Sequence, residues 1–121
     1  MISFDDVEWK TEKVRFRRRA AGRLRMLAHL PDGGRVILFE RSEASKESSP
    51  LSSRVITVIW CARISHDTSG TLLGHGKGKT ARAAFGVACR SVVRRLPATL
   101  RRLRRELVSI ERVGYAVDGV P

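Results

Sequence analysis

The sequence predicts a single α+β domain in which an antiparallel sheet of three to five strands is packed by two C-terminal helices. Up to about residue 74, apolar residues alternate with polar ones or form short apolar runs, as in strands. From Thr80 onward they recur every three or four positions, as in helices. The chain has 121 residues and shows no internal repeat or domain boundary, so residues 1–121 are expected to form one domain.

The N-terminal third is expected to form a strand and a hairpin. Val14–Arg19 alternates apolar and basic residues and indicates a short strand that ends in Arg17, Arg18 and Arg19. Leu24–Leu30 fits both the alternation of a strand and the stripe of a helix. Pro31–Gly34 then has the residues of a tight turn, and Arg35–Phe39 is rich in β-formers. We therefore expect a hairpin; the alternative is a helix followed by a loop.

The middle of the chain is expected to complete the sheet. Ser42–Ser53 is polar and rich in serine, which indicates a long surface loop. Arg54–Ile64 is the strongest strand and is apolar on both faces, as expected of a central strand covered by helices. His66–Gly70 is typical of a turn, and Thr71–Gly74 begins the returning strand.

Two helices are expected after this strand. Thr80 can cap the first, whose apolar stripe is Ala84, Phe85, Ala88, Cys89, Val92 and Leu96. Pro97 is expected to break that helix and to begin the next one, over residues 98–113. The second helix has its own stripe, Leu100, Leu103, Leu107 and Ile110, and the tail from Gly114 is expected to fray.

The charge is the strongest indication of function. Lysine and arginine number 24 against 12 acidic residues, which gives a net charge of +12. Such an excess predicts a polyanionic partner, with nucleic acid first, an acidic protein second and a membrane last. Arginine outnumbers lysine, and its planar guanidinium suits phosphate. A GC-rich genome would explain arginine over lysine but would not explain the net charge.

The sequence says less about the cellular location of the protein and about the role of its two cysteines. No apolar stretch approaches the length of a membrane span, and the first residues lack the basic and apolar regions of a signal peptide, so we expect a cytoplasmic protein. Cys61 and Cys89 lie in apolar runs without a neighbour at metal-ligand spacing. They are expected to be buried and structural, and neither a metal nor a cofactor is expected.

Alternate glycines precede the first predicted helix in the run Gly74-His75-Gly76-Lys77-Gly78-Lys79-Thr80. Glycines of this kind allow a close backbone approach, and amides at a helix start attract anions. A P-loop is rejected, because Leu73 stands where its first glycine belongs and no later strand could carry a magnesium-binding aspartate. The simplest interpretation is a tight turn followed by close helix packing.

The run from Leu73 to Val93 resembles the end of a double-stranded-RNA-binding domain. Thr80 stands at the family's helix-start serine, Ala84 and Ala88-Cys89 stand at its small positions, and Val92-Val93 form its closing apolar pair. The resemblance covers about residues 35–96 and implies binding of duplex RNA by shape, through phosphates and 2′-hydroxyls. Two departures weaken the duplex specificity, so DNA is an equally defensible ligand. Ala81 and Arg82 stand at the family's two lysines, and its preceding helix is missing if residues 24–30 form a strand.

Two phosphate-binding sites are expected from the basic clusters. The first is Lys77, Lys79 and Arg82; the second follows the C-terminal helices through Arg94, Arg101, Arg102, Arg104 and Arg105. Arg17, Arg18 and Arg19 could extend the footprint. Only Glu106 and Glu111 can neutralise the second cluster from within. The stripe of Leu100, Leu103, Leu107 and Ile110 could also pair with a partner chain, although two heptads are short for a coiled coil.

The expected function is non-enzymatic binding of nucleic acid, duplex favoured, mainly through its phosphates. A small ribonuclease using His75 is a less favoured alternative, because no second group stands at a fixed spacing from it. The other alternative is a small phage or mobile-element regulator that occupies an acidic or nucleic-acid-binding host protein. The sequence leaves DNA versus RNA, sequence preference, oligomeric state and pathway open.

Overall fold

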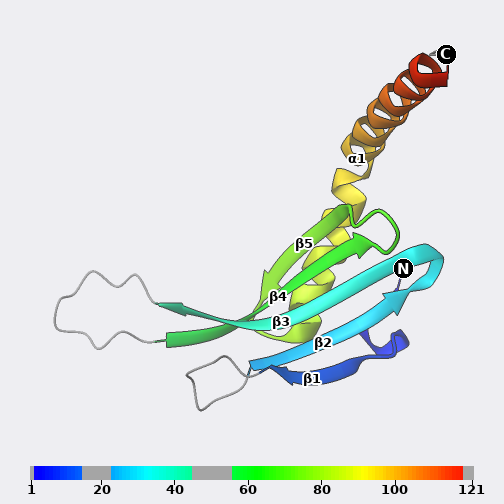
Figure 1. The fold of residues 1–121 in the computed structure, drawn as a ribbon. Helices are drawn as coiled ribbons and strands as arrows, with labels where there is room; N and C mark the ends of the chain where they lie inside the picture. Colours follow the sequence, from blue (N-terminus) through cyan, green and yellow to red (C-terminus); the bar gives the residue numbers. More distant parts are fainter. Residues whose placement is uncertain (1, 15–22, 45–55, 119–121) are drawn as a thin grey trace.

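The computed structural model describes residues 2–14, 23–44 and 56–118, which form a sheet layer and a helix layer (Figure 1). The strands in chain order are β1 (Lys10–Val14), β2 (Arg23–Leu30), β3 (Gly34–Ala44), β4 (Ile56–His66) and β5 (Leu72–Gly78). Two short 3-10 helices, η1 (Phe4–Asp6) and η2 (Pro31–Gly33), precede β1 and join β2 to β3. The helix α1 (Ala81–Asp118) follows β5.

The sheet is an antiparallel meander in which the spatial order β1-β2-β3-β4-β5 equals the chain order. Leu27 on β2 is paired with Ile37 on β3, and Ile37 is paired with Arg63 on β4. The register between β4 and β5 shifts once, at Ile64 and Ser65. The predicted α+β class is therefore confirmed, with five strands in the described part of the chain.

The predicted hairpin is confirmed, because residues 24–30 belong to β2 and pair with β3 across the predicted turn. Asp32 and Gly33 at this turn have positive φ angles of 63° and 88°, a conformation that aspartate tolerates and glycine adopts freely. The predicted turn therefore led to the correct choice of a strand over a helix for residues 24–30.

Two predicted boundaries in the first half differ from the structure. The first strand ends at Val14, where the sequence indicated that it began, and Arg17, Arg18 and Arg19 lie outside the described residues. β3 continues to Ala44, past the expected start of the serine-rich loop, because Ser42 and Glu43 still pair with β4. The rest of that loop, from residue 45, also lies outside the described residues.

The prediction of two helices is wrong, because a single helix runs from Ala81 to Asp118 through Pro97. Proline removes the hydrogen bond that position 97 would donate to the carbonyl of Val93. Val93 is 67% exposed, so its carbonyl lies on the solvent side, where water can satisfy it. The expected fraying from Gly114 is also wrong, since α1 continues to Asp118. The predicted cap is confirmed: the Ala83 amide donates to the Thr80 hydroxyl over 3.1 Å.

The core lies between the first half of α1 and strands β3 and β4. Its buried residues are Val36, Leu38, Ala62, Ile64, Ala84, Phe85 and Ala88. Beside the helix, Phe4 and Trp9 pack on Phe85, with centroid separations of 6.2 Å and 5.4 Å. Among the described elements, helix packing buries one face of the sheet only. Leu96, expected in the apolar stripe, is 45% exposed.

The alternate glycines lie inside β5, on the side where α1 packs. A Cβ atom at Gly74, Gly76 or Gly78 would stand 2.6 Å or 2.7 Å from atoms of Val92, Ala88 and Ala84 respectively. Such distances are far inside van der Waals contact, so no side chain fits at these places. The glycines therefore allow the helix α1 to approach the strand β5 closely.

Candidate nucleic-acid interface

The face of the sheet that points away from α1 is not covered by any of the described helices. Side chains alternate between the two faces along each strand, and directly paired residues share a face. Val36 and Leu38 of β3 are buried under α1, so their neighbours Arg35, Ile37 and Phe39 point to the other face. The strand pairing then carries this assignment across the whole sheet.

Cations from all five strands meet on this face. We name them the open-face patch: Lys10, Arg25, Arg35, Arg41, Arg63 and Lys77. All are exposed except Arg25, which is half-buried. The patch therefore presents positive charge across the width of the sheet.

Glu12 on β1 is a carboxylate on this face. It accepts a hydrogen bond from Arg25 over 2.7 Å and lies 3.8 Å from the Lys10 ammonium. The hydrogen bond from Arg25 lowers the pKa of Glu12, so the glutamate stays ionised. Its negative charge offsets part of the positive charge at this end of the patch. Arg35, Arg41 and Arg63 lie on the neighbouring strands, away from this carboxylate.

Apolar side chains occupy the centre of the same face. Leu27, Ile37, Phe39 and Ile59 are half-buried, and Cys61 is buried. Phe39 is paired with Arg25 on one side and with Cys61 on the other, which places its ring between the two ends of the patch. A flat apolar centre surrounded by guanidinium and ammonium groups suits a polyanion that also carries planar apolar groups.

The structure separates the residues of the first predicted phosphate site. Lys77 lies on β5 and belongs to the open-face patch, and Lys79 is exposed between β5 and α1. Arg82 instead donates two hydrogen bonds to the carboxylate of Asp5, over 2.8 Å and 2.7 Å, and lies 5.0 Å from the ring centroid of Phe4. Arg82 thus holds the N-terminal segment against the start of α1.

The arginines of the second predicted site lie on α1, on the opposite side of the molecule from the open-face patch. Arg94, Arg101 and Arg105 fall at spacings that place them on one side of the helix, together with Arg90 and Arg112, and all are exposed. Arg102 and Arg104 flank this stripe. Ala84 and Ala88 turn the other side of the helix to the sheet. The molecule therefore has two basic surfaces, one on the sheet and one on the helix α1.

The sequence did not indicate most of the open-face patch. Each strand contributes only one or two cations, and no short segment contains a cluster of them. Alternation within Arg35–Arg41 was a usable signal, but the strand register that aligns Lys10 with Arg63 through Leu27 and Ile37 cannot be read from a single strand.

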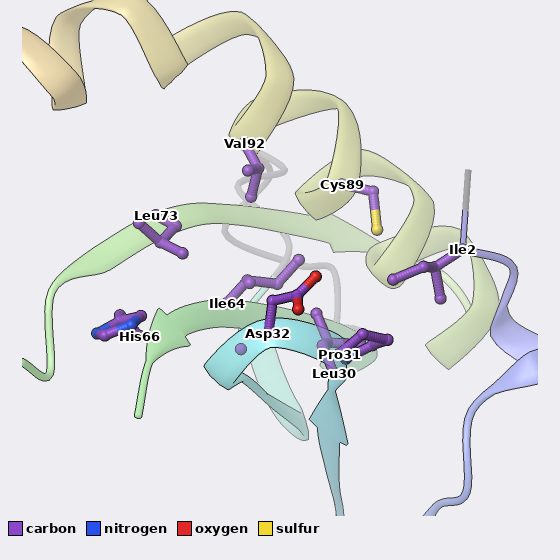
Figure 2. A pocket seen from close by; sticks show the side chains of 10 residues that line it. Ile2, Leu30, Pro31, Asp32, Ile64, His66, Leu73, Cys89 and Val92 are labelled. Atoms are coloured by element: carbon purple, nitrogen blue, oxygen red, sulfur yellow. The ribbon is translucent and has the colours of Figure 1, made fainter. Parts of the chain in front are cut away.

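A cavity of about 280 Å³ lies between the first half of α1 and the turn from β2 to β3 (Figure 2). Leu30, Ile64, Leu73, Cys89 and Val92 form most of its lining, and Asp32 and His66 are its polar side chains. Both cysteines are free thiols, and burial raises the pKa of Cys89. This apolar cavity is a packing gap beside the core and offers no set of converging polar groups.

The histidines do not assemble a catalytic group in the described part of the chain. His29 lies 3.4 Å from Asp67, His66 lies 3.1 Å from the Ser69 hydroxyl, and His75 is exposed on the open face opposite Arg63. No three histidine, cysteine or acidic side chains among the described residues are placed to hold a metal ion. None of the described helices combines the length and apolarity needed to cross a bilayer.

Comparisons with protein-family models, with curated proteins and with solved structures found no match. Function is therefore inferred from the chemistry of the two basic surfaces.

Proposed function

We propose that this protein binds nucleic acid without catalysing a reaction on it, and that it contacts mainly phosphates through the open-face patch. The observation that carries the proposal is the gathering of six cations from five strands on an uncovered sheet face. One described carboxylate, Glu12, offsets two of them. A surface of this charge attracts a polyanion and releases its counterions on binding.

The resemblance to double-stranded-RNA-binding domains supports a duplex as the ligand. Strands β3, β4 and β5 and the start of α1 follow one another in the order that the resemblance implies, whereas residues 24–30 belong to the strand β2, where the family has its preceding helix. The half-buried apolar centre around Phe39 supports unpaired bases instead, because a duplex keeps its base faces stacked internally. The ligand class is therefore decided by comparing duplex RNA, duplex DNA and single strands under the same conditions.

The test is fluorescence anisotropy with labelled nucleic acids over a series of salt concentrations. The double substitution Arg35→Ala with Arg63→Ala removes two exposed cations from the open-face patch. Each lost phosphate contact lowers the slope of log affinity against log salt by about one unit, so a reduction of about two is expected. The weakening should be similar for all sequences of one ligand class.

The matched control is Arg101→Ala with Arg105→Ala, which removes the same charge from the outer side of α1. If binding uses the sheet face, this control keeps the slope of the unaltered protein. A loss confined to the helix variant would place the interface on α1 and contradict the open-face assignment. No binding of any nucleic acid near physiological salt would overturn the proposal and direct the search to an acidic protein partner.

A ribonuclease is excluded by the same samples if labelled RNA stays intact during the titration. Cleavage that disappears in His75→Ala would contradict the non-enzymatic proposal, since His75 lies on the open face opposite Arg63. A positioned imidazole beside a cation is a sufficient start for phosphodiester chemistry, which makes this check necessary.

A further inference from the structure

The second half of α1 extends beyond the sheet (Figure 1). It carries an apolar stripe of exposed side chains. Thr99 is the last buried residue of the helix. Side chains of the stripe recur at spacings of four and three: Leu96, Leu100, Leu103, Leu107, Ile110 and Val117, with Gly114 in the remaining place. Leu107, Ile110 and Val117 are 58%, 66% and 65% exposed. A regular row of large exposed apolar side chains marks an interaction surface.

This spacing is that of a coiled-coil seam. Leu100, Leu107 and Gly114 occupy the first core position of successive heptads, and Leu103, Ile110 and Val117 occupy the second. Because α1 continues through Pro97, Leu96 belongs to the same helix and the seam spans about three heptads. That length is sufficient for a helix pair, whereas the two heptads of a separate helix would be short.

The charges beside the seam select one orientation of two identical helices. Arg104 and Glu111 both follow a second core position, and Glu106 precedes a first core position. In a parallel pair, Glu106 of each copy would face Glu111 of the other, which places like charges together on both sides. In an antiparallel pair with Leu107 opposite Ile110 of the second copy, Arg104 of each copy faces Glu111 of the other.

We propose that a second copy of this chain docks antiparallel on this stripe and forms a twofold dimer. The same register sets Leu103 opposite Gly114 of the second copy, so a large side chain meets a small one. Leu103, Leu107 and Ile110 also line a groove of about 310 Å³ against the turn between β4 and β5, so this turn borders the seam on one side. Arg101, Arg105 and Arg112 lie on the far side of the helix, so the positive charge of these three arginines is kept away from the contact.

The experiment is sedimentation equilibrium of the full chain in reducing buffer, which prevents a disulfide through Cys61 or Cys89 from mimicking the dimer. The unaltered protein should be a dimer, and Leu107→Glu should be a monomer with an unchanged circular dichroism spectrum. The matched control is Val108→Glu, which places the same charge one residue away from the seam, where Val108 is 46% exposed. This control should remain a dimer.

The orientation is tested by Glu111→Arg. In the antiparallel dimer this change puts the introduced guanidinium against Arg104 of the other copy on both sides, so the dissociation constant should rise about tenfold, and Arg104→Glu in the same chain should restore it. In a parallel dimer Glu111→Arg would instead relieve repulsion and tighten association. Tighter association, a monomeric unaltered protein, or a dimer that survives Leu107→Glu would each overturn the proposal.

Discussion

Gly76 on β5 lies so close to Ala88 on α1 that a Cβ atom on the glycine would stand 2.6 Å from the amide nitrogen of Ala88. Gly74 and Gly78 make equally close approaches one helical turn away on either side. The helix therefore rests on the backbone of β5 over its first three turns, and this contact fixes the distance between the two layers.

Gly76→Ala should destabilise the protein by about 2 kcal/mol, because the added methyl group forces the helix and the strand apart. Gly86→Ala is the matched control: its Cβ would meet only the end of Arg90 at 3.6 Å. Since Gly86 lies inside α1, alanine there should add roughly 0.5 to 1 kcal/mol of stability. Urea denaturation followed by circular dichroism measures both; equal effects of the two changes would show that the glycines of β5 are not needed for packing.

Pro97→Ala should stabilise the protein by about 1 kcal/mol. Alanine restores the hydrogen bond to the carbonyl of Val93, and part of this gain is offset by the greater freedom of the unfolded chain. Thermal unfolding gives the change in stability, and amide hydrogen exchange should slow at residues just after position 97. Faster exchange there would mean that Pro97 supports the helix instead of weakening it.

Asp5→Asn should release the N-terminal segment from α1, because Asn cannot form the ion pair with Arg82. The hydrogen bond from Arg82 lowers the pKa of Asp5 below its ordinary value of 3.8. Its stabilising contribution is therefore fully present above pH 3.8 and is lost as the pH falls through the lower value of the folded state.

Fluorescence of Trp9 in a Trp60→Phe background should report this release, since Trp9 packs on Phe4 and Phe85. The acid-dependent change in this signal should disappear in Asp5→Asn and persist in Glu8→Gln, which removes a neighbouring charge. An unchanged acid transition in Asp5→Asn would assign the titration to another group.

Phe39→Leu should weaken the binding of single strands about fivefold or more and leave duplex binding unchanged, provided that the open face is the nucleic-acid site. The aromatic ring offers a stacking surface to an unpaired base, and leucine keeps the apolar packing without the ring. Phe39→Tyr preserves the ring and should preserve the affinity. Equal losses for single strands and duplexes in Phe39→Leu would indicate that Phe39 only supports the sheet.

An element could be predicted from the sequence where the residues that determine it lie close together in the chain. Pro31–Gly33 fixed the hairpin, and Thr80 with the spacing of Ala84 and Ala88 fixed the start of the helix. Pro97 was misread because its cost depends on whether the carbonyl of Val93 faces solvent, which is a property of the packed helix.

The candidate site was harder to predict because it is assembled by strand register. Arg35 and Arg63 are 28 positions apart in the chain, yet they lie on neighbouring strands and share a face. Arg82 was grouped with Lys77 and Lys79 because it is close to them in the sequence. In the structure its guanidinium instead donates hydrogen bonds to Asp5, which is far away in the chain. Neither the shared face of Arg35 and Arg63 nor the contact of Asp5 with Arg82 can be predicted from a short stretch of sequence.

The strands lie in the sheet in the same order as in the chain, and this order affects how the protein folds. Each strand pairs with the strand made just before it, so the sheet assembles from contacts between neighbouring strands, which favours rapid folding. The clasp of Asp5 and Phe4 on Arg82 and Phe85 is different, because Asp5 and Arg82 are 77 positions apart in the chain. The N-terminal segment is therefore expected to join last, onto a core that is already formed.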